Sequence, residues 1–166
     1  MTTELEVTEE TKERPLPPPE DGFVMARPEF FMKAEDDKMI QPEGIEYFQY
    51  WQTPVSEITG GRMNVTVVRS THKAETHLGS PWHYHEWDFA VSVVTKGWAE
   101  FEFEGVGKVR LEPGMIMYQA SMNRHREIYM SPDFEGVEIN VPARVPTTFL
   151  LPGEGAEEWK KVTAVY

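Results

Sequence analysis

Cysteine is absent from the 166 residues of the sequence. Disulfide bonds and catalysis by a protein thiol are therefore excluded. The sequence also lacks any apolar run long enough to span a bilayer or to serve as the hydrophobic part of a signal peptide. Without a membrane span or an address for another compartment, the expected location is the cytoplasm.

Basic residues are few compared with acidic ones. The chain has 16 lysines and arginines against 28 aspartates and glutamates, which gives a formal net charge of −12. Nucleic acids and anionic membrane surfaces repel such a protein, so neither is an expected partner.

From residue 45 onward, short β-prone segments alternate with turns. Residues 63–69 (MNVTVVR) are rich in β-branched side chains, and residues 99–104 (AEFEFE) alternate as in a strand with one buried and one solvated face. Turns that contain glycine or proline, such as Pro113-Gly114, separate these segments. Many short strands without a helical period predict an all-β sandwich or barrel, a pattern shared by lipocalins, immunoglobulin sandwiches and jelly rolls.

Two histidines stand two residues apart in the segment PWHYHEWDFAVSVVTKG, at His83 and His85. In an extended strand they point to the same face, which suits a single metal ion, although a His-x-His pair alone is a weak signal. A second segment, LEPGMIMYQASMNRHR at residues 111–126, holds a proline-glycine turn, an apolar strand and then His125.

Together these two segments resemble the two halves of the cupin metal-binding motif, over roughly residues 60–145. The matching positions are His83, His85 and Gly97 in the first half, and Gly107, Pro113-Gly114 and His125 in the second half. The chain is thus similar to small single-domain cupins. The resemblance implies an all-β jelly-roll barrel, also called a double-stranded β-helix.

Four segments are predicted along the chain. Residues 1–22 are acidic and proline-rich, with too few apolar side chains to offset the entropy lost on ordering, so we expect a disordered tail. Residues 23–58 are expected to form an N-terminal arm and the first strands. The cupin barrel core is placed at residues 59–145 and a C-terminal extension at residues 146–166.

The resemblance implies that His83, His85 and His125 bind one divalent ion. The glutamate ligand of the family pattern falls on Ala90, so this is a three-histidine variant of the motif. Imidazole suits several transition metals. We favour Fe(II), with Mn, Zn or Ni as alternatives.

A substitute for the missing acid is available nearby. Glu127 shares the parity of His125 and faces the same side if the strand has no bulge, so it is a candidate fourth ligand or general base. Tyr129 has the same parity and is a candidate catalytic hydroxyl or a core tyrosine. Glu86 and Asp88, just after the histidine pair, are weaker candidates.

Three neutral imidazoles leave the charge of a divalent ion uncompensated and several of its coordination positions open. Such a centre favours a small, oxygenated, chelating substrate. Some three-histidine cupins are iron oxygenases, so the resemblance implies a dioxygenase-like oxidoreductase. The alternatives are a metal-dependent isomerase or lyase with Glu127 as base, or a non-catalytic ligand-binding cupin.

The segment Phe89 to Val94 is apolar or small on both of its faces. A strand covered on both sides within one thin barrel needs an outer cover. Either the N-terminal arm or a second subunit supplies it, and we expect a homodimer, the commonest closed assembly.

Overall fold

The structure is a computed structural model that describes residues 28–42, 45–153 and 159–165. The part before Met32 is a separate unit, of which the described portion is a single 3₁₀ turn, η1 (Pro28–Phe30). The predicted disordered tail lies outside the described residues. No helix among the described residues is long and apolar enough to cross a membrane.

The unit that begins at Met32 is built almost entirely of strands, so the all-β prediction is confirmed. Its helical elements are two single turns, η2 (Asp36–Lys38) and α2 (Val55–Ile58). The strands are β1 (Phe48–Gln52), β2 (Asn64–Ser70), β3 (Thr76–His77), β4 (Trp82–His85), β5 (Phe89–Lys96), β6 (Ala99–Phe103), β7 (Gly107–Leu111), β8 (Ile116–Tyr118), β9 (His125–Met130), β10 (Glu135–Val141), β11 (Pro146–Pro152) and β12 (Trp159–Val165).

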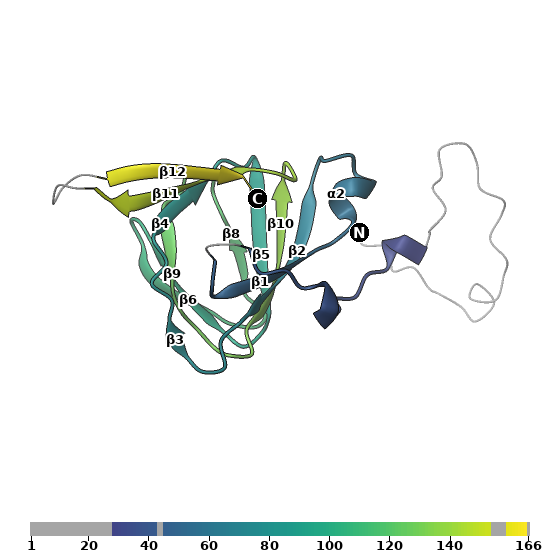
Figure 1. The fold of residues 1–166 in the computed structure, drawn as a ribbon, viewed down its shortest axis with the longest axis horizontal. Coiled ribbons are helices and arrows are strands. Elements are labelled where there is room, and N and C mark those ends of the chain that lie inside the picture. The colour runs from purple at the N-terminus through teal and green to yellow at the C-terminus, as the bar shows by residue number, and fades with distance from the viewer. Residues whose placement is uncertain (1–27, 43–44, 154–158, 166) are drawn as a thin grey trace, which may run out of the picture. The chain divides into compact units, whose positions relative to one another are not determined.

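The strands form two antiparallel sheets (Figure 1). The first sheet has the order β1-β2-β10-β5-β8. The second has the order β12-β11-β4-β9-β6-β7, with β3 paired beside β9. Strands that are neighbours in a sheet are mostly distant in sequence, which is the connectivity of a jelly roll. The predicted jelly-roll barrel is therefore confirmed.

An apolar cluster fills part of the space between the two sheets. Phe48 and Val94 from the first sheet meet Phe101, Leu111 and Met130 from the second. Burial of each large side chain contributes about 1.5–3 kcal/mol, so this cluster is a main source of the attraction between the sheets.

The alternation seen in the sequence at β6 agrees with the structure. Ala99 and Phe101 are buried in the apolar cluster. Glu102, on the opposite face, accepts a hydrogen bond from Nε of Arg126 at 2.8 Å. One face of the strand is therefore packed and the other carries ion pairs.

The turn between β5 and β6 requires a glycine. Gly97 has a φ of +63°, a backbone conformation that side chains other than glycine rarely adopt. A Cβ atom at this position would lie 2.2 Å from Oγ of Ser131 and 2.8 Å from the backbone nitrogen of Phe134. The glycine at this position of the sequence motif therefore has a local steric reason.

Strand β11 lies within the segment predicted as a C-terminal extension. It pairs with β4, so that Thr147 lies opposite His85 and Phe149 lies opposite His83. Strand β12 then pairs with the outer edge of β11. Residues 146–152 are therefore an integral part of the sheet that carries the histidine pair, while the domain boundaries themselves stay predictions.

Candidate metal centre

The structure brings together the three histidines that the sequence predicts as ligands. Strand β4 presents His83 and His85, and β9 places His125 directly opposite His83. The ring centroids are 4.4 Å apart for His83 and His125, 5.1 Å for His83 and His85, and 5.3 Å for His85 and His125. One potential ligand atom from each ring lies within 4.8 Å of the others, a spacing that a single ion can bridge.

Hydrogen bonds fix the orientation of the first and third rings. Nδ1 of His83 lies 3.0 Å from the carbonyl oxygen of Pro81, and Nδ1 of His125 lies 3.1 Å from that of Asn123. A carbonyl only accepts, so in each neutral ring Nδ1 carries the proton and donates it. The lone pair of Nε2 is therefore left for a metal ion, as is usual for histidine ligands.

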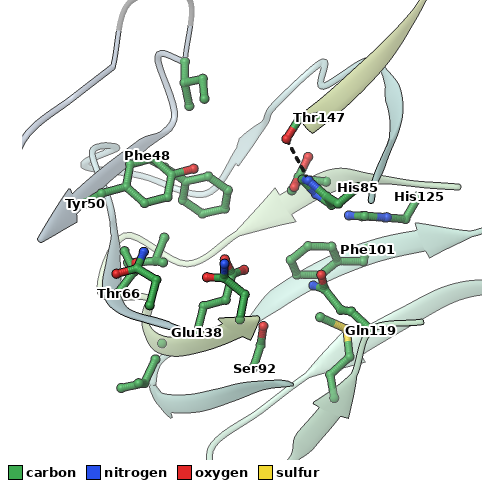
Figure 2. Close-up of a pocket in the computed structure, with 18 of the residues that line it drawn as sticks. Phe48, Tyr50, Thr66, His85, Ser92, Phe101, Gln119, His125, Glu138 and Thr147 are labelled. Carbon is green, nitrogen blue, oxygen red and sulfur yellow. Dashed lines mark hydrogen bonds between the residues drawn. The ribbon is translucent and has the colours of Figure 1, made fainter. Parts of the chain in front are cut away.

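The ring of His85 is held from two sides. Its Nδ1 lies 2.8 Å from Oγ1 of Thr147 on β11 (Figure 2). Its face stacks on Trp87 with ring centroids 4.2 Å apart and an interplanar angle of 20°. The indole of Trp87 is itself fixed, because its Nε1–H donates to the carbonyl of Gln119 at 3.0 Å.

The surroundings of His85 and His125 favour the neutral imidazole, the form that binds a metal ion. Burial, followed by the neighbouring His83 and His125, lowers the pKa of His85 to about 2. Burial and His83 lower the pKa of His125 to about 4, with Glu127 acting in the opposite direction. The donor set and its protonation state therefore fit a divalent transition-metal ion.

Glu127 lies at the edge of this cluster, as its parity with His125 predicted. Its Oε1 is 3.7 Å from Nε2 of His83, and its Oε2 accepts a short hydrogen bond from the hydroxyl of Ser80. Burial alone would raise the pKa of Glu127, but His83, His125 and the Ser80 hydroxyl stabilise the carboxylate and hold its pKa below the ordinary value. An ionised carboxylate is thus buried beside the histidines.

The other acids near the histidine pair lie elsewhere. Glu86 and Asp88 are exposed and do not line the interior of the barrel. Ala90, which takes the position of the family glutamate, is completely buried on β5 and offers no donor atom. Glu127 is therefore the carboxylate that the structure places at the cluster.

Tyr129 does not join the cluster, because β9 contains a bulge. Phe101 pairs with Glu127 but Glu100 pairs with Tyr129, so one residue of β9 is left unpaired between them. The bulge breaks the parity on which the prediction depended. The ring of Tyr129 packs edge-on against His77, with centroids 5.0 Å apart, and does not line the interior.

A cavity of about 190 Å³ opens beside the cluster and is lined by all three histidines and by Glu127. Aromatic side chains from both sheets form part of its wall, among them Phe48 and Phe101 (Figure 2). The first sheet contributes a polar band to the same cavity, made of Gln52, Asn64, Thr66, Ser92, Glu138 and Asn140. A small molecule in this cavity would contact the histidines and the polar band together.

Sequence reasoning missed the polar band. In the segment EGVEINV the alternation suggests that valine and isoleucine face the core and that Glu138 faces water. The structure has Glu138 and Asn140 in the cavity wall together with Val137, whereas Ile139 does not line it. The sequence shows that Glu138 and Asn140, two residues apart in a strand, share one face of it. Nothing in the sequence indicates that this face points into the barrel.

No family model matches the chain, and no curated protein matches it by sequence. Several solved structures are similar. The polyketide cyclase RemF from Streptomyces resistomycificus matches with a TM-score of 0.56 and 13% identity, over 75% of this chain and 88% of that chain. KdgF from Halomonas sp. matches with a TM-score of 0.50 and 21% identity, over 65% of this chain and 92% of that chain.

A sugar phosphate isomerase from a cupin superfamily, from Silicibacter pomeroyi, has a TM-score of 0.48 and 12% identity, over 71% of this chain and 77% of that chain. RemF and KdgF are themselves cupin-superfamily proteins. At sequence identities this low, the similarity to these structures shows only a shared fold. The chain has the jelly-roll barrel fold of the cupin superfamily, as the two sequence motifs predicted.

Proposed function

We propose that the chain is a metal-dependent enzyme that binds one divalent ion through Nε2 of His83, His85 and His125. The observation that carries this proposal is the convergence of three imidazoles whose Nδ1 atoms are already engaged. The ligand set suits several transition metals. Fe(II) remains the favoured ion, with Mn, Zn or Ni as alternatives.

The proposed substrate is a small molecule with two adjacent oxygen atoms. Three protein ligands leave open positions on a divalent ion, and the cavity of about 190 Å³ lies on that side of the cluster. When bound, the ion would supply Lewis-acid polarisation of the substrate oxygens. The aromatic wall of the cavity keeps water away from this contact.

Glu127 is proposed as the group that accepts a proton from the substrate. Its carboxylate is ionised, buried and 3.7 Å from Nε2 of His83, so it borders the space where a chelating substrate would sit. The Ser80 hydroxyl holds Oε2, and Oε1, which lies beside His83, is the oxygen proposed to take the proton. This arrangement favours proton-transfer chemistry, as in an isomerase or a lyase.

Dioxygenase-like oxidoreductase chemistry is the second candidate. It is favoured by Ala90, which leaves three neutral ligands where the family pattern has an additional carboxylate. A non-catalytic small-ligand-binding protein is the remaining alternative. The fold alone does not choose among these functions.

The test uses metal-loaded protein and a panel of small 2-hydroxy acids, 2-oxo acids and diketones in D₂O. NMR follows exchange of the substrate C–H next to the carbonyl, while an electrode follows oxygen in parallel samples of the iron form. The variants are Glu127→Gln and, as a matched control, Glu57→Gln, which removes an exposed glutamate that does not line the cavity.

We expect C–H exchange or turnover that needs both the ion and Glu127, without oxygen consumption. Exchange that persists in Glu127→Gln would contradict the role of Glu127. Oxygen uptake by the iron form would instead favour the dioxygenase. A panel member that binds without any turnover would favour the binding protein.

A further inference from the structure

The polar band on the first sheet is centred on Glu138 of β10. In the sheet register Glu138 lies between Thr66 of β2 and Ser92 of β5. Figure 2 shows these three side chains on one wall of the pocket, to which His85 and His125 reach from other strands. The cavity therefore has the histidine cluster on one sheet and an acidic group on the other.

The carboxyl group of Glu138 lacks a compensating charge. Its side chain faces the cavity, where it is half-buried, and has no hydrogen-bond or ion-pair partner among the residues that the structure describes. None of the described residues that line the cavity is a lysine or an arginine. Burial, with the added effect of the charge on Glu127, raises the pKa of Glu138 to about 7. A cation placed beside this carboxyl group would therefore stabilise its ionised form.

Hydrogen-bond acceptors are in excess in the cavity lining. The side-chain amide of Asn64 donates to Oε1 of Gln52 at 2.7 Å and to Oγ1 of Thr66 at 2.9 Å, which fixes its orientation. Its Oδ1, and Oε1 of Gln119, are buried without a hydrogen-bond partner among the described residues. Unpaired buried acceptors are uncommon, and a ligand that donates hydrogen bonds would relieve them.

Aromatic rings complete the surroundings of this wall. Phe48, Phe101 and Phe134 all line the cavity. The faces of such rings carry a partial negative charge and attract cations, an ammonium group included. Acidic, acceptor-rich and aromatic surfaces thus coincide, whereas no basic side chain is present among the described lining to receive an anion.

We propose that Glu138, supported by Asn64 and Gln119, forms a subsite for a protonated amine of the substrate. The inference rests on the proposed metal site, since it places the two recognition groups in one cavity. The substrate would then be a small amino compound whose chelating oxygens face the histidines and whose ammonium group faces Glu138. A phosphate or carboxylate at the Glu138 end is disfavoured because no lysine or arginine among the described lining residues neutralises its charge.

The test measures affinities rather than activity, by calorimetry on zinc-loaded protein with three hydroxamates. Their hydroxamate end chelates the ion, and their tails have equal length: 4-aminobutanohydroxamate, 4-hydroxybutanohydroxamate and pentanohydroxamate. Homologues with shorter and longer tails cover the span of the cavity. We expect the amine to bind at least about tenfold more tightly than the apolar compound at its best length, the scale of one charge-assisted hydrogen bond.

Glu138→Gln should remove that preference and leave the affinity for pentanohydroxamate unchanged, whereas the exposed control Glu57→Gln should keep it. Equal affinities of the three compounds for the wild type would overturn the amine subsite and leave the metal site standing. Equally tight binding of the hydroxyl compound would assign the subsite to a neutral donor and also overturn it. Failure of every hydroxamate to bind would overturn the metal site and the subsite together. The wild-type comparison remains decisive even if the variant is poorly folded.

Discussion

Two glutamates share the interior of this barrel but ionise differently. Burial disfavours the charge of both. At Glu127, two histidines and the Ser80 hydroxyl more than offset that cost, so the carboxylate persists. At Glu138 there is no such compensation, and the negative charge of Glu127 adds to the cost. Environments that separate two carboxyl pKa values in one cavity are typical of acid–base and binding sites.

The raised pKa of Glu138 predicts a specific pH dependence of stability. Between its ordinary value of 4.5 and about 7, the folded protein binds a proton that the unfolded chain has released. Stability contributed by the protonated group is therefore complete below pH 4.5 and is lost as the pH rises to about 7. We expect the loss to be on the order of 1–3 kcal/mol, and Glu138→Gln to abolish it.

Urea denaturation of metal-free wild type and Glu138→Gln at pH 5 and pH 8 measures this effect. The remaining titrating groups that face the cavity, Glu127 on β9 and the histidines on β4 and β9, are common to both proteins, so the difference reports Glu138 together with its electrostatic coupling to Glu127. The variant should gain stability relative to the wild type at pH 8. Parallel behaviour of the two proteins would contradict the raised pKa.

Parity along a strand decided which site residues the sequence could predict. The prediction for His83 and His85 required only that residues two positions apart in a strand face the same side. His125 was predicted from the resemblance to a known motif. Glu127, two residues further, was still in phase. Tyr129 was not in phase, because the bulge in β9 shifts the register between Glu127 and Tyr129. A bulge that contains no glycine leaves little trace in the sequence. Glu138 was missed because a cavity reverses the usual rule that polar residues of a strand face water.

At the scale of elements, the site depends on contacts between strands far apart in sequence. Strand β4 lies between β11 and β9 in its sheet, so the ring of His85 is held by Thr147, 62 residues later. The existence of most strands between β1 and β10 followed from turn signals and β-propensity. Their pairing did not, because a single sequence contains no information on which distant strands are neighbours. Strand β11 was not predicted as part of the barrel for this reason.

The turn after β5 offers a test of how tightly the two sheets are joined. We expect Gly97→Ala to destabilise the protein by about 2–4 kcal/mol, since it combines a left-handed backbone with overlap against Ser131 and Phe134. Gly105→Ala is a matched control, because Gly105 has a φ of +83° but nothing within 4 Å of the added atom. It should cost only about 1 kcal/mol. Equal losses in chemical denaturation would show that the close contact at Gly97 is unimportant.

At the scale of the whole molecule, the first sheet ends in an apolar edge. Strand β8 pairs only with β5 among the described strands, and it exposes Ile116 (71%) and Tyr118 (64%) beside the exposed Phe89. Exposed apolar side chains on an edge strand favour association with another chain. The homodimer predicted from the sequence remains a prediction, and this edge is where we expect the contact.

Light scattering at micromolar concentration should give a mass near twice 19.2 kDa for the wild type. Ile116→Lys should shift the protein to the monomer, because it places a charge in the expected interface. Val106→Lys, at an equally exposed position in the turn between β6 and β7, should not. A monomeric wild type would reject the homodimer.

The central claim is that three histidines hold a metal ion inside this barrel, and elemental analysis of protein purified without added metal tests it most directly. The samples are the wild type, His83→Ala and the control His72→Ala, a histidine outside the cluster and the cavity lining, with circular dichroism to verify folding. We predict about one transition-metal ion per chain in the wild type and in His72→Ala, and its loss from His83→Ala. Equal metal content in all three folded proteins would contradict the proposed centre.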